Sequence, residues 1–99
     1  MLADPAGVTA EAHALLGALR YEKGDLSKAA ESYETAIRMD PGPNSSSAQN
    51  RLGVLRQARG DLEGAMASFQ ASARADPGRF EAHLNLGTLQ TASSLVGIS

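Results

Sequence analysis

The chain has no cysteine and only four aromatic residues among its 99 amino acids. Without cysteine it has neither a disulfide framework nor a thiolate metal site. Acidic and basic residues nearly balance, with a formal net charge of −2, so the sequence lacks the strong positive charge that nucleic-acid binding requires. No hydrophobic run is long enough to span a bilayer. We therefore expect no nucleic acid and no membrane among its partners.

The start of the chain also lacks the basic residues and apolar run of a secretion signal, so a cytoplasmic location is the default expectation. Its length allows one compact helical segment rather than several domains.

Motifs that carry catalysis are missing as well. The sequence shows no phosphate-cradling glycine loop, no nucleophile motif and no metal-ligand spacing. Two Glu-x-His pairs, Glu11 with His13 and Glu81 with His83, are the nearest candidates. Side chains two residues apart on a helix face different directions, so we interpret each histidine as a packing residue. The sequence predicts no catalytic residue, no metal, no cofactor and no enzyme activity.

What the chain does contain is a repeat. The dipeptide Asp-Pro recurs every 36 residues, at residues 4–5, 40–41 and 76–77. Between these points the same residue classes return in register: Ala12-His13-x-x-Leu16-Gly17 as Ala48-Gln49-x-x-Leu52-Gly53 and Ala82-His83-x-x-Leu86-Gly87; Gly24-Asp25-Leu26-x-x-Ala29 as Gly60-Asp61-Leu62-x-x-Ala65; and Tyr33 as Phe69. A fixed period of this length is typical of stacked supersecondary units.

Small and aromatic residues in this pattern predict close helix packing. Gly17 and Gly53 have no Cβ, so a second helix can approach the first closely at these points. Tyr33 and Phe69 would supply most of the buried aromatic surface.

Helix ends are predicted by two further signals. Gly24-Asp25 and Gly60-Asp61 combine a residue suited to left-handed dihedrals with an N-cap acceptor, which ends one helix and begins the next. The residue before proline is pushed out of the helical region, so Asp40 and Asp76 should end their helices.

These anchors resemble the tetratricopeptide repeat, a helix-turn-helix unit of about 34 residues. The matching residues are His13, Leu16, Gly17, Ala29, Tyr33, Ala36 and Pro41 in the first unit; Leu52, Gly53, Ala65, Phe69 and Pro77 in the second, where Gln49 takes the aromatic site and Ser72 replaces a small Ala; and His83, Leu86 and Gly87 in the third. The resemblance implies an all-α solenoid of two full repeats plus the first helix of a third.

The apolar spacing places the helices and units. We expect helices at Ala10–Lys23, Leu26–Met39, Ser47–Arg59, Leu62–Ala75 and Arg79–Ser93. The units are then 1–9, the end of a preceding repeat or a lead-in; 10–43, repeat 1; 44–79, repeat 2 with a longer connecting loop; and 80–99, a partial repeat 3 with a C-terminal tail. The serine-rich residues 42–47 should form a flexible loop that also caps the next helix, and we favour a tolerated insertion over a binding loop.

In the resembling family the first helix of each unit lines a concave groove that takes an extended or helical peptide. Carried over by register, the groove positions here are Ala14, Ala18, Tyr21 and Glu22; Asn50, Arg51, Val54 and Gln57; and Leu84, Asn85, Thr88 and Thr91. Asn50 and Asn85 could hold a peptide backbone, or could be ordinary solvated residues. Chaperone adaptors of the family grip a terminal carboxylate with Lys or Arg, where this chain has Ala14, Ala18, Asn85 and Thr88, so we do not expect that activity.

The sequence therefore predicts a protein-interaction module with a protein or peptide partner. Two alternatives remain open. The incomplete third unit could self-associate into a homo-oligomer through apolar residues that no neighbour covers. The candidates for this are Leu89, Leu95, Val96 and Ile98, with Leu84 and Leu86 also expected to be exposed. Alternatively, the segment is the non-catalytic, substrate-positioning part of a larger enzyme.

Overall fold

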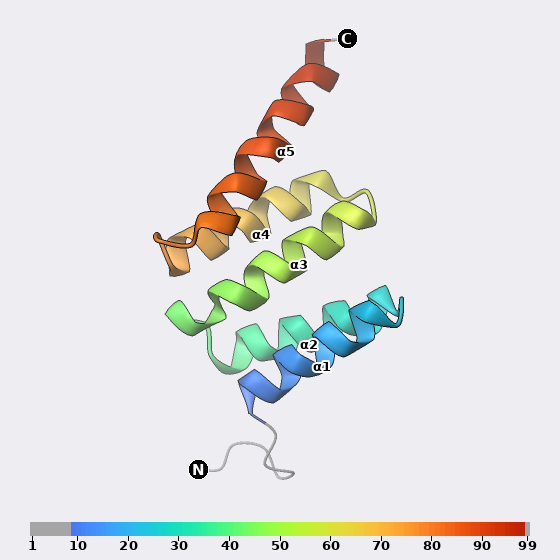
Figure 1. The fold of residues 1–99 in the computed structure, drawn as a ribbon, viewed down its shortest axis with the longest axis vertical. Helices are drawn as coiled ribbons and strands as arrows, with labels where there is room; N and C mark the ends of the chain where they lie inside the picture. Colours follow the sequence, from blue (N-terminus) through green and yellow to red (C-terminus); the bar gives the residue numbers. More distant parts are fainter. Residues whose placement is uncertain (1–8, 99) are drawn as a thin grey trace.

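The computed structural model describes residues 9–98, with side chains from residue 9 to residue 91. Its regular elements in this part of the chain are all helical, and they follow one another as an elongated zigzag, 52 × 29 × 16 Å, in which each helix packs on the next (Figure 1). They are α1 (Ala10–Glu22), α2 (Leu26–Met39), the 3₁₀ turn η1 (Pro43–Ser45), α3 (Ser46–Ala58), α4 (Leu62–Ala75) and α5 (Phe80–Ile98). The expected all-α helical-repeat architecture is confirmed.

The predicted helix signals work as expected in the first two units. Gly24 and Gly60 adopt left-handed φ values of +84° and +85°, which end α1 and α3. Asp25 and Asp61 then cap α2 and α4, each accepting a hydrogen bond from a backbone N–H three residues on. The bounds of α1 to α4 consequently lie within one residue of those predicted.

The packing contact inside each hairpin is an aromatic ring seated on a glycine. A Cβ added to Gly17 would lie 2.9 Å from Tyr33 Cδ1, and one added to Gly53 would lie 2.5 Å from Phe69 Cε1. Both rings are buried, as the sequence predicts. The α1–α2 and α3–α4 hairpins are therefore held at a separation that only glycine permits at these positions.

A polar bond repeats beside this contact. Arg20 Nη1 donates to Ser32 Oγ at 2.9 Å, and Arg56 Nη1 donates to Ser68 Oγ at 2.8 Å. In each case the arginine lies near the end of the first helix and the serine lies on the second. The sequence analysis did not identify these pairs, although they share the period of 36 residues.

Residues 42–47 have more regular secondary structure than predicted. They form one 3₁₀ turn followed by the first turn of α3, and Ser45 and Ser46 are buried. Ser45 occupies the N-cap position of α3 but makes no capping bond, because its hydroxyl donates to the carbonyls of Pro41 and Gly42. The run supplies the N-cap residue of α3, as expected, but without a capping hydrogen bond, and it forms a helical turn where a loop was predicted.

Ser72 replaces a small alanine because its hydroxyl makes a bond that alanine cannot. Ser72 Oγ donates to the Ser46 carbonyl at 2.7 Å, and Ser46 Oγ donates to the Ser72 carbonyl at 2.9 Å. Arg79 Nε also donates to Ser46 Oγ at 2.7 Å. These bonds join the start of α3 to α4 and to the residue before α5.

Helix α5 ends five residues later than predicted, at Ile98 rather than Ser93, and begins at Phe80 rather than Arg79. At the position where α1 and α3 are ended by Gly-Asp, this helix carries Ser94-Leu95, which gives no stop signal. Figure 1 shows α5 running on past α4 instead of turning back.

Two glycines at the same repeat position allow a matched test of the ring contact. An added Cβ would meet Phe69 at Gly53 but nothing within 4 Å at Gly87. Gly87→Ala should raise the free energy of unfolding by about 1 kcal/mol through helix propensity alone. Gly53→Ala should lower it, because overpacking costs about 1–3 kcal/mol and exceeds that gain. Urea denaturation measures both, and shifts of the same sign would contradict the account.

Candidate functional site

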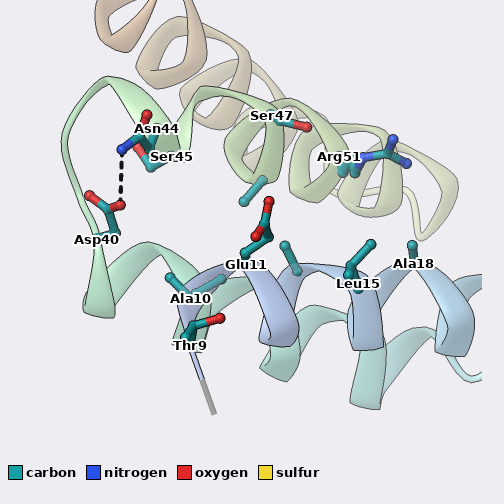
Figure 2. A pocket seen from close by; sticks show the side chains of 13 residues that line it. Thr9, Ala10, Glu11, Leu15, Ala18, Asp40, Asn44, Ser45, Ser47 and Arg51 are labelled. Atoms are coloured by element: carbon teal, nitrogen blue, oxygen red, sulfur yellow. Dashed lines mark hydrogen bonds between the residues drawn. The ribbon is translucent and has the colours of Figure 1, made fainter. Parts of the chain in front are cut away.

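The first helices of the three units, α1, α3 and α5, line two adjoining cavities. The first, of about 650 Å³, lies between α1 and α3 and is shown in Figure 2, where Glu11, Leu15 and Ala18 face α3 and its Ser47 and Arg51. Its lining residues are Thr9, Ala10, Glu11, Ala14, Leu15, Ala18, Ala36, Asp40, Asn44, Ser45, Ser47, Ala48 and Arg51. Five of these residues are alanine, whose short side chains leave room for the main chain of a ligand.

The second cavity, of about 460 Å³, lies among the end of α1, the middle of α3 and the start of α5. Its lining residues are Tyr21, Tyr33, Ser47, Asn50, Arg51, Val54, Arg79, Phe80, Glu81, Leu84 and Asn85. Ser47 and Arg51 line both cavities. The two spaces therefore meet at α3, and together they are called the groove below.

The structure brings eight of the twelve predicted groove residues to these walls. They are Ala14, Ala18, Tyr21, Asn50, Arg51, Val54, Leu84 and Asn85. Glu22, Gln57, Thr88 and Thr91 line neither cavity, although all four are exposed. Glu22 and Gln57 lie at the C-terminal ends of α1 and α3, and Thr88 and Thr91 lie in the middle of α5. The binding role of the whole set stays a prediction.

Asn50 and Asn85 bond to each other across the two units. Asn85 Nδ2 donates to Asn50 Oδ1 at 3.1 Å, and Asn50 is only 7% exposed. One donor and one acceptor of the pair are thus already used inside the protein. Asn85, which is half-buried, keeps a second amide hydrogen and its carbonyl oxygen for another group.

The wall formed by α5 and the end of α1 is apolar and open. Phe80 is 73% exposed, Leu84 is 55% exposed and Tyr21 is 41% exposed, and all three line the second cavity. Leu15, at 63% exposed, adds an apolar side chain to the first. The groove thus offers large apolar surfaces at both of its ends.

Sequence reasoning missed Phe80, Arg79, Glu81 and Ser47 as groove residues. Phe80 lies one helical turn before Leu84, so extending the register by one turn would have found it. Arg79 Nη1 forms an ion pair with Glu81 Oε1 at 3.2 Å, and Arg79 also holds Ser46. The apolar Phe80 therefore lies between two residues that are bonded to each other.

Arg51 is the cation at the junction of the two cavities, and it is exposed. Within the described part of the chain, the ion pairs of arginine involve Arg56 and Arg79 and not Arg51. Its neighbour is Tyr33. Burial raises the pKa of Tyr33, and hydrogen bonding and positive charge from the Arg51 guanidinium oppose that rise.

The histidines differ in their surroundings. His83 Nε2 lies 2.8 Å from the Pro77 carbonyl oxygen, and Glu81 pairs with Arg79 instead of with this histidine. His83 is exposed, so the prediction that it fills a packing site is wrong, because none of the helices in the described residues covers it. His13 is half-buried. Among the residues described, no three His, Cys, Asp or Glu side chains gather in a way that could hold a metal ion.

The predicted self-association residues divide into two sets. Leu89 is 1% exposed and packs with Ala65 and Phe69 in the core between α4 and α5, so its expected exposure is wrong. The side chains of Leu95, Val96 and Ile98 lie outside the described part of the structure. Leu86 is half-buried and packs against the same core, whereas Leu84 is exposed as expected.

A search for membrane-crossing helices gave no candidate in the described residues, since none of the helices there is both long and apolar enough.

Helical hairpins stacked through a repeated glycine–aromatic contact, with a groove along their first helices, define an α-solenoid repeat protein. A family model described as tetratricopeptide repeat matches residues 14–80 and, in a second placement, residues 50–92. The chain belongs to the tetratricopeptide repeat family.

No curated protein matches the chain. A solved structure, the first TPR of Spaghetti (RPAP3) bound to the HSP90 peptide SRMEEVD, is similar at 19% sequence identity and a TM-score of 0.48. The match covers 87% of this chain and 94% of that one. Likeness at this level carries no argument about ligands.

The raised pKa of Tyr33 predicts how stability changes at alkaline pH. A tyrosine whose pKa is higher in the folded state contributes fully below its unfolded value of 10.0, and this contribution is lost as the pH rises through the folded value. Tyr33→Phe keeps the ring, as Phe69 does in the second unit, and removes the titration. Its free energy of unfolding should therefore fall less steeply above about pH 10.

Urea denaturation at several alkaline pH values measures this slope. A Tyr33→Phe slope equal to that of the unmodified chain would show that burial of the phenol does not govern its titration.

Proposed function

We propose that the chain is a protein-interaction module that binds a peptide segment in the groove along α1, α3 and α5. The observation that carries the proposal is the meeting of the two cavities at Ser47 and Arg51, which gives one surface across all three units. A peptide in this position would contact each repeat at once, which suits an extended chain.

The lining indicates which parts of a peptide would bind where. Phe80, Leu84 and Tyr21 supply an apolar wall for a large side chain, and such anchors carry most of the energy in interfaces. The free amide hydrogen and carbonyl oxygen of Asn85 lie beside this wall and suit a peptide backbone. The alanine-lined cavity between α1 and α3 would hold the main chain with small side chains.

The groove favours a peptide with few charges. Arg51 is its exposed cation, while Glu11 and Asp40 line the neighbouring cavity and Arg79 is neutralised by Glu81. The positions that hold a terminal carboxylate in chaperone adaptors of the family are Ala14, Ala18, Asn85 and Thr88 here, none of them a cation. A ligand such as the acidic HSP90 tail of the similar structure is therefore not part of the proposal.

A phage-displayed library of linear peptides, selected on the 99-residue chain, tests the proposal. Selected peptides should carry a large apolar residue, and Leu84→Asp should weaken their binding about 30-fold, the loss expected when an interface anchor is removed. Gln70→Asp, at an exposed position on α4 away from the groove, is the matched control and should have no effect. Peptides that bind all three chains equally well, or a library that gives no binder, would contradict the proposed site.

A further inference from the structure

A row of residues on α5 is exposed at positions that the second helix of the hairpin covers in the first two units. His83, Gly87 and Gln90 lie on one face of the helix, at spacings of four and three residues. All three are exposed, whereas the glycines at the equivalent position in α1 and α3 are buried. A Cβ added to Gly87 would meet nothing within 4 Å.

In the first two units, the second helix of the hairpin covers this row in the same way each time. An aromatic ring, Tyr33 or Phe69, rests on the glycine. One residue earlier on that helix is a serine, Ser32 or Ser68, that accepts from the arginine three residues after the glycine. The position equivalent to those arginines in α5 is Gln90, whose side-chain amide is also a donor.

The covering helices share a sequence pattern. A small residue is followed three positions later by Ser and four positions later by an aromatic residue. A second small residue stands three positions after the aromatic one. Residues that follow the pattern are Ala29, Ser32, Tyr33 and Ala36 in α2, and Ala65, Ser68, Phe69 and Ser72 in α4. All eight are buried, so the pattern describes the face with which α2 and α4 pack against other helices.

Helix α5 lacks the Gly-Asp turn that ends α1 and α3. In the first two units Gly-Asp stands seven and eight residues after the packing glycine and turns the chain back. At the same distance from Gly87 the chain has Ser94-Leu95, and α5 continues as a helix to Ile98. The chain therefore does not turn back at this point, and within residues 9–98 no second helix lies over Gly87.

We propose that this face of α5 binds an amphipathic helix of another protein, one that carries the pattern small-x-x-Ser-aromatic-x-x-small. Its aromatic ring rests on Gly87 and its serine accepts from Gln90, which completes a third hairpin between two molecules. A second copy of this chain is the poorer occupant, because its helices with the pattern, α2 and α4, are already seated on Gly17 and Gly53. His83, Gly87 and Gln90 line neither cavity of the groove, and the proposal does not depend on peptide binding there.

The chain itself supplies the probe. A fluorescein-labelled peptide of residues 62–75, the sequence of α4, carries the full pattern. Its anisotropy should rise when the 99-residue chain is added at concentrations up to about 1 mM, a range chosen because a short isolated helix is only marginally formed. The same peptide with Phe69→Ala should bind at least about tenfold more weakly, because it lacks the ring.

Gly87→Leu and Thr88→Leu in the full chain are the matched variants. Both add the same side chain at adjacent exposed positions, and circular dichroism should show both folded. Gly87→Leu fills the place of the ring and should weaken peptide binding at least about tenfold, whereas Thr88→Leu should leave it unchanged.

Three outcomes would overturn the proposal. One is no binding by the unmodified chain. Another is binding that is insensitive to Gly87→Leu, which would mean that the peptide displaces α4 from Gly53. The third is a dimer of the unmodified chain in light scattering that Gly87→Leu dissociates, which would make a second copy the occupant of this face.

Discussion

The contact between an aromatic ring and a glycine sets the geometry on which the rest of the structure depends. With Tyr33 on Gly17 and Phe69 on Gly53, each pair of antiparallel helices is fixed at one close separation. That separation brings Arg20 to Ser32 and Arg56 to Ser68, so the polar bonds inside each hairpin follow from the ring contact. Because polar groups buried without a partner are costly, the bonds in turn favour this one arrangement.

Stacking of the hairpins produces the groove. The bonds among Ser46, Ser72 and Arg79 join the start of α3 to α4 and to the residue before α5, and Asn85 bonds to Asn50 across the same units. These links fix α5 beside α3, and Phe80 and Leu84 of α5 stay exposed in the wall of the groove. The groove and the uncovered face of α5 are thus two consequences of one repeated packing scheme.

Local signals decided what could be predicted from the sequence. Gly24, Gly60, Asp40 and Asp76 act through their own backbone preferences, so the ends of the first four helices could be placed within one residue. Burial and hydrogen bonds between residues distant in the sequence could not be predicted in this way. The burial of Leu89 depends on Phe69 of another helix, and the burial of Ser46 is accompanied by hydrogen bonds to Ser72 of α4. For the groove, register alone predicted Leu84 and Asn85 as lining residues, but not that Asn85 bonds to Asn50.

Native-state hydrogen exchange, followed by NMR for each amide, tests most directly the claim that the ring–glycine contact governs this structure. The account predicts that amides of α3, which is seated on Phe69 and covered on both sides, require the largest opening free energy. Amides of α5 beyond Gly87, where no ring covers the helix, should exchange much faster. Equal protection of α3 and of this part of α5 would contradict the central claim.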